Sequence, residues 1–264
     1  QYDEAEQLYR KVMQLQETMN LPPNHGPVVV VNSLAIVLQN RNRIDEAIEL
    51  FEKAQRLCEP LKPRENRDTI RTMINLGSAY AAASRLEEAE ELLSEVKSMS
   101  QGRFGEHYLT TLAIEHYQTA LLQREKFSKA KLNGREWVRA LENSGKTKQL
   151  PEAQVSFAEA LIEIGDYQQA ADLLNSIEKS DELDPEQRIR LEALTGWLKF
   201  KQGDTAEAAK LLTSAYEEFQ SLKTVDVDKR WYSRAIVRRL VNLHESSGDT
   251  DAVKLWQERL EKNR

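Results

Sequence analysis

The sequence has only one cysteine among its 264 residues and no long apolar run. A single thiol cannot form an internal disulfide, so nothing indicates an oxidising compartment, and we interpret Cys58 as small apolar filler near the end of a helix. Apolar runs such as the valines at 28–31 stay far below the roughly 18 residues that span a membrane. We therefore predict a cytoplasmic protein without a membrane segment.

An excess of basic charge is also missing, as are the motifs of common enzymes. The chain has 37 Lys and Arg against 43 Asp and Glu, a net charge of −6 with both signs interspersed, which argues against a nucleic-acid partner. None of the four histidines stands at a metal-binding spacing. The GKT at 145–147 lacks the leading glycine of a phosphate loop, because residue 140 is Ala140. With no serine-hydrolase or kinase motif either, we predict no catalysis, no metal and no cofactor for this segment.

What the sequence does contain is a helical hairpin pattern between Asn75 and Val96. Leu76, Gly77 and Tyr80 fall on one face of a first helix, and Ala89 and Leu93 on one face of a second. The small residues Gly77 and Ala89 would let the two backbones approach closely, while the larger side chains fill the space beside them.

The same signal recurs along the chain at a nearly constant interval. Successive signals are 42, 42, 41, 40, 38 and 44 residues apart, and each ends at a marker alanine: Ala5, Ala47, Ala89, Ala130, Ala170, Ala208 and Ala252. Such a period is typical of helical repeats, in which each unit packs only on its neighbours.

The pattern L-G-x-x-Y followed by the spaced alanine resembles the tetratricopeptide repeat (TPR), with Met73 where that family prefers tryptophan. The segment FGEHYLTTL is similar to the connection of the longer kinesin-light-chain-like variety, although Tyr108 replaces its proline. The ending SGDTDAVKLWQERLEKNR resembles the close of repeat arrays that follow the catalytic domain in some bacterial serine/threonine kinases. The resemblance implies an all-α fold, a right-handed superhelical α-solenoid of about six hairpins plus one unpaired N-terminal helix.

We expect a single array over residues 1–264. LPPNHGP at 21–27 predicts a loop, and the repeat register places the valines at 28–31 in a helix against their strand propensity. We expect a distortion in the Ala130 repeat, where Gln118 and Gly134 replace the usual residues, and a bend near 143–151. Because Ala5 marks a second helix without its first, we interpret the chain as a fragment of a longer protein. The repeats are predicted near 1–18, 28–58, 67–98, 108–142, 151–179, 186–222 and 229–262.

The resemblance also implies a concave groove lined by the first helices, which would bind a peptide or a partner protein. Asn75 stands where family members that hold peptides bond the ligand main chain, or else it bridges neighbouring helices. Arg71, one turn earlier, could pair with an acidic ligand group. Asn32 replaces the lysine of the carboxylate clamp, which disfavours binding of chaperone tails. The groove candidates are Asn32, Ser33, Ile36, Arg71, Asn75, Ser78, His116, Thr119, Ser156 and Glu159.

The predicted function is therefore a protein-interaction scaffold that is part of a larger signalling protein. One alternative is a ligand- or peptide-sensing domain that controls an attached effector such as a kinase, and another is an accessory segment that completes an active site elsewhere. The unpaired N-terminal helix would leave Leu8, Val12 and Leu15 exposed, so we also expect self-association through that helix.

Overall fold

The computed structural model describes residues 2–19, 25–105, 107–178, 183–222 and 231–262. All regular structure in these ranges is helical, and none of the described residues forms a strand, so the predicted all-α class is confirmed. No helix in the same ranges is long and apolar enough to cross a membrane. The chain divides into two compact units, Gln1–Arg124 (unit 1) and Glu125–Arg264 (unit 2), and each is described by itself.

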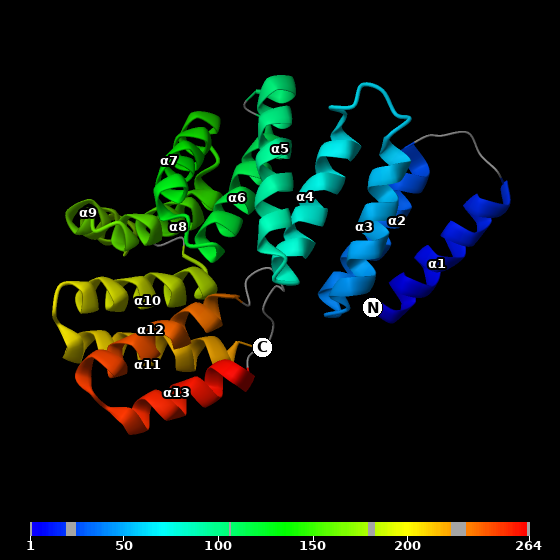
Figure 1. The fold of residues 1–264 in the computed structure, drawn as a ribbon. Coiled ribbons are helices and arrows are strands. Elements are labelled where there is room, and N and C mark those ends of the chain that lie inside the picture. Colours follow the sequence, from blue (N-terminus) through cyan, green and yellow to red (C-terminus); the bar gives the residue numbers. More distant parts are fainter. Residues whose placement is uncertain (1, 20–24, 106, 179–182, 223–230, 263–264) are drawn as a thin grey trace. The chain divides into compact units, whose positions relative to one another are not determined.

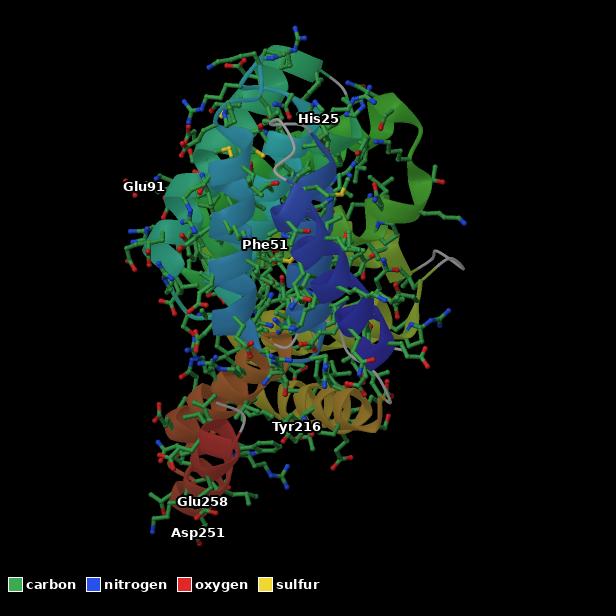
Figure 2. The ribbon with its side chains drawn as sticks, turned by 90° about the vertical axis from the view of Figure 1, so that its right-hand side faces the viewer. His25, Phe51, Glu91, Tyr216, Asp251 and Glu258 are labelled. Carbon is green, nitrogen blue, oxygen red and sulfur yellow. The ribbon has the colours of Figure 1, made fainter. Side chains whose placement is uncertain are left out.

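Unit 1 begins with one helix that packs on the first of two hairpins (Figure 1). Each hairpin consists of a first helix and a second helix: α2 pairs with α3, and α4 pairs with α5. The unit ends with α6, the first helix of the next repeat, which packs on both α4 and α5. Phe51 lies among the packed helices, whereas Glu91 extends away from α5 (Figure 2). The bounds are α1 Tyr2–Met19, α2 His25–Asn40, α3 Ile44–Cys58, α4 Arg67–Ala82, α5 Leu86–Phe104 and α6 Tyr108–Gln123.

Unit 2 continues the same alternation of first and second helices. It begins with the second helix α7, which packs on α8, and continues with the hairpins α8–α9, α10–α11 and α12–α13. The first helices are also neighbours, since α10 contacts both α8 and α12. The bounds are α7 Phe127–Ser144, the 3-10 helix η1 Thr147–Gln149, α8 Leu150–Glu163, α9 Tyr167–Glu178, α10 Pro185–Lys201, α11 Thr205–Ser221, α12 Trp231–Ser247 and α13 Thr250–Lys262.

Each turn between a first and a second helix uses one residue with a left-handed backbone. After α4 this residue is Ser84, with φ of 61°, and the N–H of Arg85 closes the turn on the carbonyl oxygen of Tyr80 at 2.8 Å. The equivalent residues are Asn42 and Glu125 after α2 and α6, and the glycines 165, 203 and 248 after α8, α10 and α12. The recurring turn places each marker alanine four or five residues after the left-handed residue.

The close approach predicted at Gly77 is confirmed by the geometry of the α4–α5 hairpin. A Cβ atom on Gly77 would lie 2.6 Å from Cγ and 2.7 Å from Cδ2 of Leu93, so only glycine fits without movement of the neighbour. Ala89, on the facing helix, and Leu93 are fully buried. A similar contact recurs in unit 2, where a Cβ on Gly196 would lie 3.0 Å from Cβ of Leu211.

The start of α2 differs from the sequence prediction. The predicted loop at 21–27 is wrong for its last three residues, because α2 already begins at His25, while residues 21–24 lie outside the described part. Pro27 is tolerated there because first-turn N–H groups have no partner within a helix. The helical interpretation of the valines at 28–31 is confirmed, and Val28 and Val31 are buried. Repeat register therefore overrides local strand propensity in this segment.

The Ala130 repeat is where the two units divide. Helices α6 and α7 are both continuous, so the expected distortion does not break either helix, and Gln118 and Gly134 are buried within them. The division between units falls at Arg124 and Glu125, in the turn between these two helices. The bend expected near 143–151, where α7 is followed by η1 and α8, stays a prediction.

Candidate functional site

The first helices of unit 1 lie side by side and are tied by polar contacts. Nδ2 of Asn32 on α2 donates to Oγ1 of Thr72 on α4 at 2.5 Å. From the residue before Thr72, a guanidinium N–H of Arg71 donates to the hydroxyl of Tyr108 on α6 at 2.5 Å. Eight of the ten groove candidates lie on α2, α4 and α6, and the structure thus brings them onto three neighbouring helices.

Not all of these candidates are accessible to a ligand. Asn32 and Ser78 are buried, whereas Ile36 is 40% exposed and Arg71 is also exposed. The remaining four candidates are partly exposed: Ser33, Asn75, His116 and Thr119. The hydroxyl of Thr119 is bonded to its own helix, since it donates to the carbonyl oxygen of Glu115 at 3.3 Å.

Sequence reasoning missed two apolar side chains beside these candidates. Val29 is 48% exposed and precedes Ser33 and Ile36 at the i, i+4, i+7 spacing of one helix face. Tyr108 is 43% exposed and accepts the hydrogen bond from Arg71. The helical spacing around Ser33 was the signal that could have found Val29. The α2–α4–α6 face is the set of Val29, Ser33, Ile36, Arg71, Asn75, Tyr108, His116 and Thr119, with the buried Asn32 beneath it.

Two side-chain amide atoms at this face are buried and have no hydrogen-bond partner. They are Nδ2 of Asn75, a donor, and Oδ1 of Asn32, an acceptor. The Nδ2 group of Asn75 therefore makes no bridge to a neighbouring helix. An unmade hydrogen bond of this kind costs about 1–3 kcal/mol, because water is excluded and no partner replaces it. A peptide main chain offers the complement of both atoms, a carbonyl oxygen for the donor and an N–H for the acceptor.

Arg71 supplies a positive charge at the same face. Its guanidinium contacts the neutral hydroxyl of Tyr108 and forms no ion pair with any residue of the described ranges. An exposed arginine without a carboxylate partner retains its capacity to bind a carboxylate with two hydrogen bonds. The α2–α4–α6 face therefore combines apolar contacts, main-chain hydrogen bonding and one cation.

The last two groove candidates, Ser156 and Glu159, lie on α8 in unit 2 and are both buried. Glu159 belongs to an ion cluster that joins three first helices. One of its carboxylate oxygens accepts from Arg190 on α10 at 3.0 Å, and the other accepts from Arg239 on α12. Arg190 also donates to Glu152 on α8. Two carboxylates thus face two guanidinium groups, so this cluster is electrically balanced.

Electrostatic interactions keep Glu159 charged in spite of its burial, whereas Tyr232 stays protonated. Burial by itself would raise the pKa of Glu159, but the facing guanidinium groups of Arg239 and Arg190 lower the pKa below its usual range. Burial raises the pKa of Tyr232 well above its ordinary value, and the protonated hydroxyl donates to Glu152 at 3.0 Å.

Sequence reasoning named Glu159 but not the arginines that bind it. The missed signal is a charged or polar pair at i, i+7 on a first helix: Glu152 with Glu159 on α8, and Tyr232 with Arg239 on α12. These pairs place two polar groups on one helix face, yet nothing in their local spacing says that the partners lie 80 residues apart.

Residues 28–101, from within α2 to near the end of α5, match the family model of the tetratricopeptide repeat. This match confirms the resemblance for the part of the chain in which the hairpin pattern was first recognised. Comparison with curated protein sequences finds no relative that matches.

Solved structures resemble nearly the whole chain. The apo form of RapI has a TM-score of 0.79 at 13% identity, covering 97% of this chain and 89% of that one. A Rap protein complexed with competence and sporulation factor has a TM-score of 0.74 at 12% identity, covering 97% and 67%. A putative kinesin light chain from Podosopora anserina with nearly identical TPR-like repeats has a TM-score of 0.62 at 19% identity, covering 77% and 100%.

At these identities the likeness concerns the fold, and it confirms the predicted α-solenoid of helical hairpins. The kinesin-light-chain-like variety is among the similar structures, as the connection before α6 indicated. The resemblance of the C-terminal residues to kinase-associated repeats stays a prediction.

Proposed function

We propose that this chain, whose residues 28–101 are tetratricopeptide repeats and whose fold throughout is that of such arrays, is an interaction scaffold that binds an extended peptide on the α2–α4–α6 face. We assign no catalytic role to it, because helical repeat arrays typically act through their binding surfaces. A protein of similar fold has been solved in complex with competence and sporulation factor, which supports ligand binding as a use of this fold.

The observation that carries the proposal is the unpartnered Nδ2 donor of Asn75, a residue that is partly exposed at this face. This donor suits a main-chain carbonyl oxygen of an extended peptide. Ile36 and Val29 supply apolar contacts for ligand side chains, and Arg71 favours an acidic residue in the ligand. These features together support a short peptide segment with at least one carboxylate as the ligand.

The test is selection of peptides from a random displayed library against the whole chain, followed by affinity measurements on enriched sequences. Asn75→Ala should weaken binding about tenfold, the value of one hydrogen bond, without lowering stability, since the donor it removes has no partner. Arg71→Glu should remove the preference for acidic peptides. Asn175→Ala, at an exposed asparagine of α9, is the matched control and should leave binding unchanged.

Two results would contradict this proposal. The first is a library that yields no enriched peptide. The second is a set of peptides that bind the Asn75→Ala variant as tightly as the original chain, because the α2–α4–α6 face would then not contact them through the unpartnered amide.

We also propose self-association through α1. Leu8, Val12 and Leu15 are 63%, 38% and 52% exposed, and their i, i+4, i+7 spacing places them on one helix face. An apolar stripe of this kind favours pairing with a second copy. Light scattering should show a mass that rises with protein concentration, and Leu8→Glu should return it to the monomer. A monomer mass at every concentration would exclude the pairing.

The regulatory alternative, in which a bound ligand controls an attached effector such as a kinase, stays a prediction. The cytoplasmic location and the membership of a larger signalling protein also stay predictions. A ligand-dependent change in the activity of a full-length parent protein would test the regulatory role directly.

A further inference from the structure

Unit 2 contains a second place where buried hydrogen-bond donors have no acceptor. These donors are Nε of Arg190 on α10 and the indole Nε1 of Trp231 at the start of α12. Arg190 is only 5% exposed, and both terminal nitrogens of its guanidinium are already bound, one to Glu152 and one to Glu159. Its remaining N–H is therefore a buried donor on a charged group, a situation that costs more than an unmade neutral hydrogen bond.

The two donors belong to groups that lie against each other. The guanidinium carbon of Arg190 is 3.9 Å from the ring centroid of Tyr232 and 5.7 Å from that of Trp231. The rings of Trp231 and Tyr232 are themselves 4.2 Å apart. The hydroxyl of Tyr232 is bonded to Glu152, so the tyrosine ring is fixed in place. The two unpartnered N–H groups thus belong to one cluster of packed side chains.

The charge of the surroundings indicates which acceptor fits. Glu152 and Glu159 balance Arg190 and Arg239, so the cluster has no net charge to offer an anion. Trp231 contributes an uncharged donor. A buried carboxylate added here would lack a counter-ion, and its desolvation would be expensive. An uncharged carbonyl oxygen can use both donors without that cost.

We propose that Arg190 and Trp231 form a binding site for an uncharged amide carbonyl, such as a main-chain carbonyl of a peptide. The ring of Trp231 provides an aromatic surface against which the peptide can pack. This site is independent of the α2–α4–α6 face, because its residues all belong to unit 2, and either site can be present without the other.

The probe is acetyl-trialanine amide, which carries carbonyl groups and no charge, and its counterpart is the same peptide with a free C-terminal carboxylate. Binding to the whole chain is followed by the indole N–H signals of the four tryptophans in ¹H–¹⁵N spectra. The signal of Trp231 is identified as the one missing from the Trp231→Phe variant. We expect this signal to move in a saturable manner with the amide peptide, and the free-acid peptide to bind no more tightly.

Trp231→Phe tests the donor, because it keeps an aromatic ring and removes the N–H together with the second ring of the indole. It should weaken binding of the amide peptide about tenfold, and far-UV circular dichroism checks that the unliganded chain stays folded. Trp256→Phe in α13 is the matched control and should leave the affinity unchanged.

Three results would overturn the proposal: a Trp231 signal that neither peptide moves, tighter binding of the free-acid peptide, or full affinity in Trp231→Phe. If Trp231→Phe fails to fold, the proposal is overturned when none of the four indole signals moves with either peptide. Loss of peptide binding at the α2–α4–α6 face would leave these measurements unaffected.

Discussion

Replacing Gly77 with alanine tests the packing principle on which the repeat prediction depends. The added Cβ atom would lie 2.6 Å and 2.7 Å from two carbons of Leu93, about 1 Å inside ordinary contact. Leu93 is fully buried, so its side chain has no solvent to move into. Overpacking of this kind costs about 1–3 kcal/mol, and the higher helix propensity of alanine returns about 1 kcal/mol. We expect a net loss of up to about 2 kcal/mol in the free energy of unfolding.

Gly102, in the second helix of the same hairpin, provides a matched control. It lies in α5, and a Cβ atom there would meet nothing within 4 Å. Gly102→Ala should therefore increase stability by about 0.5–1 kcal/mol through helix propensity alone. The same chemical change at two glycines of one hairpin is thus expected to have opposite signs.

The measurement should report on unit 1 directly. All four tryptophans lie in unit 2, so we would follow urea unfolding by far-UV circular dichroism and hydrogen exchange in α4 and α5. In a Leu93→Ala background the cost of Gly77→Ala should largely disappear, because the clashing carbons are gone. If Gly77→Ala stabilises the chain as Gly102→Ala does, the close approach of α4 and α5 is not what selects glycine.

Three further outcomes follow from the turns and the ion cluster. Ser84→Gly should raise the free energy of unfolding by about 0.5–1 kcal/mol in urea titrations, because glycine adopts a φ of 61° without strain. Glu159→Gln should lower the free energy of unfolding by about 3–5 kcal/mol, since two buried guanidinium groups lose their carboxylate. The control Glu178→Gln, at an exposed glutamate, should change the free energy of unfolding little. The lowered pKa of Glu159 stabilises the fold above its unfolded pKa of about 4.3, so acid unfolding should become shallower in Glu159→Gln.

The sequence predicted what depends on small residues and on turns. Gly77 and the alanine markers indicated hairpins because close helix packing leaves room for few residue types, and those types recur at a constant interval. The same register correctly placed Val28–Val31 in a helix. The first residue of a helix was harder to predict, since His25 and Pro27 fit either a loop or a first helical turn.

Long-range polar contacts could not be predicted in the same way. Arg239 reaches Glu159 across 80 residues, and the spacing of either residue within its own helix leaves the partner undefined. The unpartnered atom of Asn75 is equally invisible in the sequence, because an asparagine at that position could have bridged two helices. The three-dimensional arrangement of the first helices shows that Nδ2 of Asn75 has no partner, and its role in peptide binding stays a prediction.

The unpartnered groups raise the question of why the chain carries them. Asn75, Asn32 and Arg190 each hold a buried polar atom without a partner, at roughly 1–3 kcal/mol apiece, against a total stability of about 5–15 kcal/mol for a typical domain. An alanine or leucine would fill the position of Asn75 without that loss, as apolar residues do elsewhere on the first helices. A ligand that supplied the missing partners would recover the loss on binding, and an analogue without them would be rejected. Such groups therefore reduce the stability of the free chain and increase its selectivity, which is the balance expected of a surface shaped for binding.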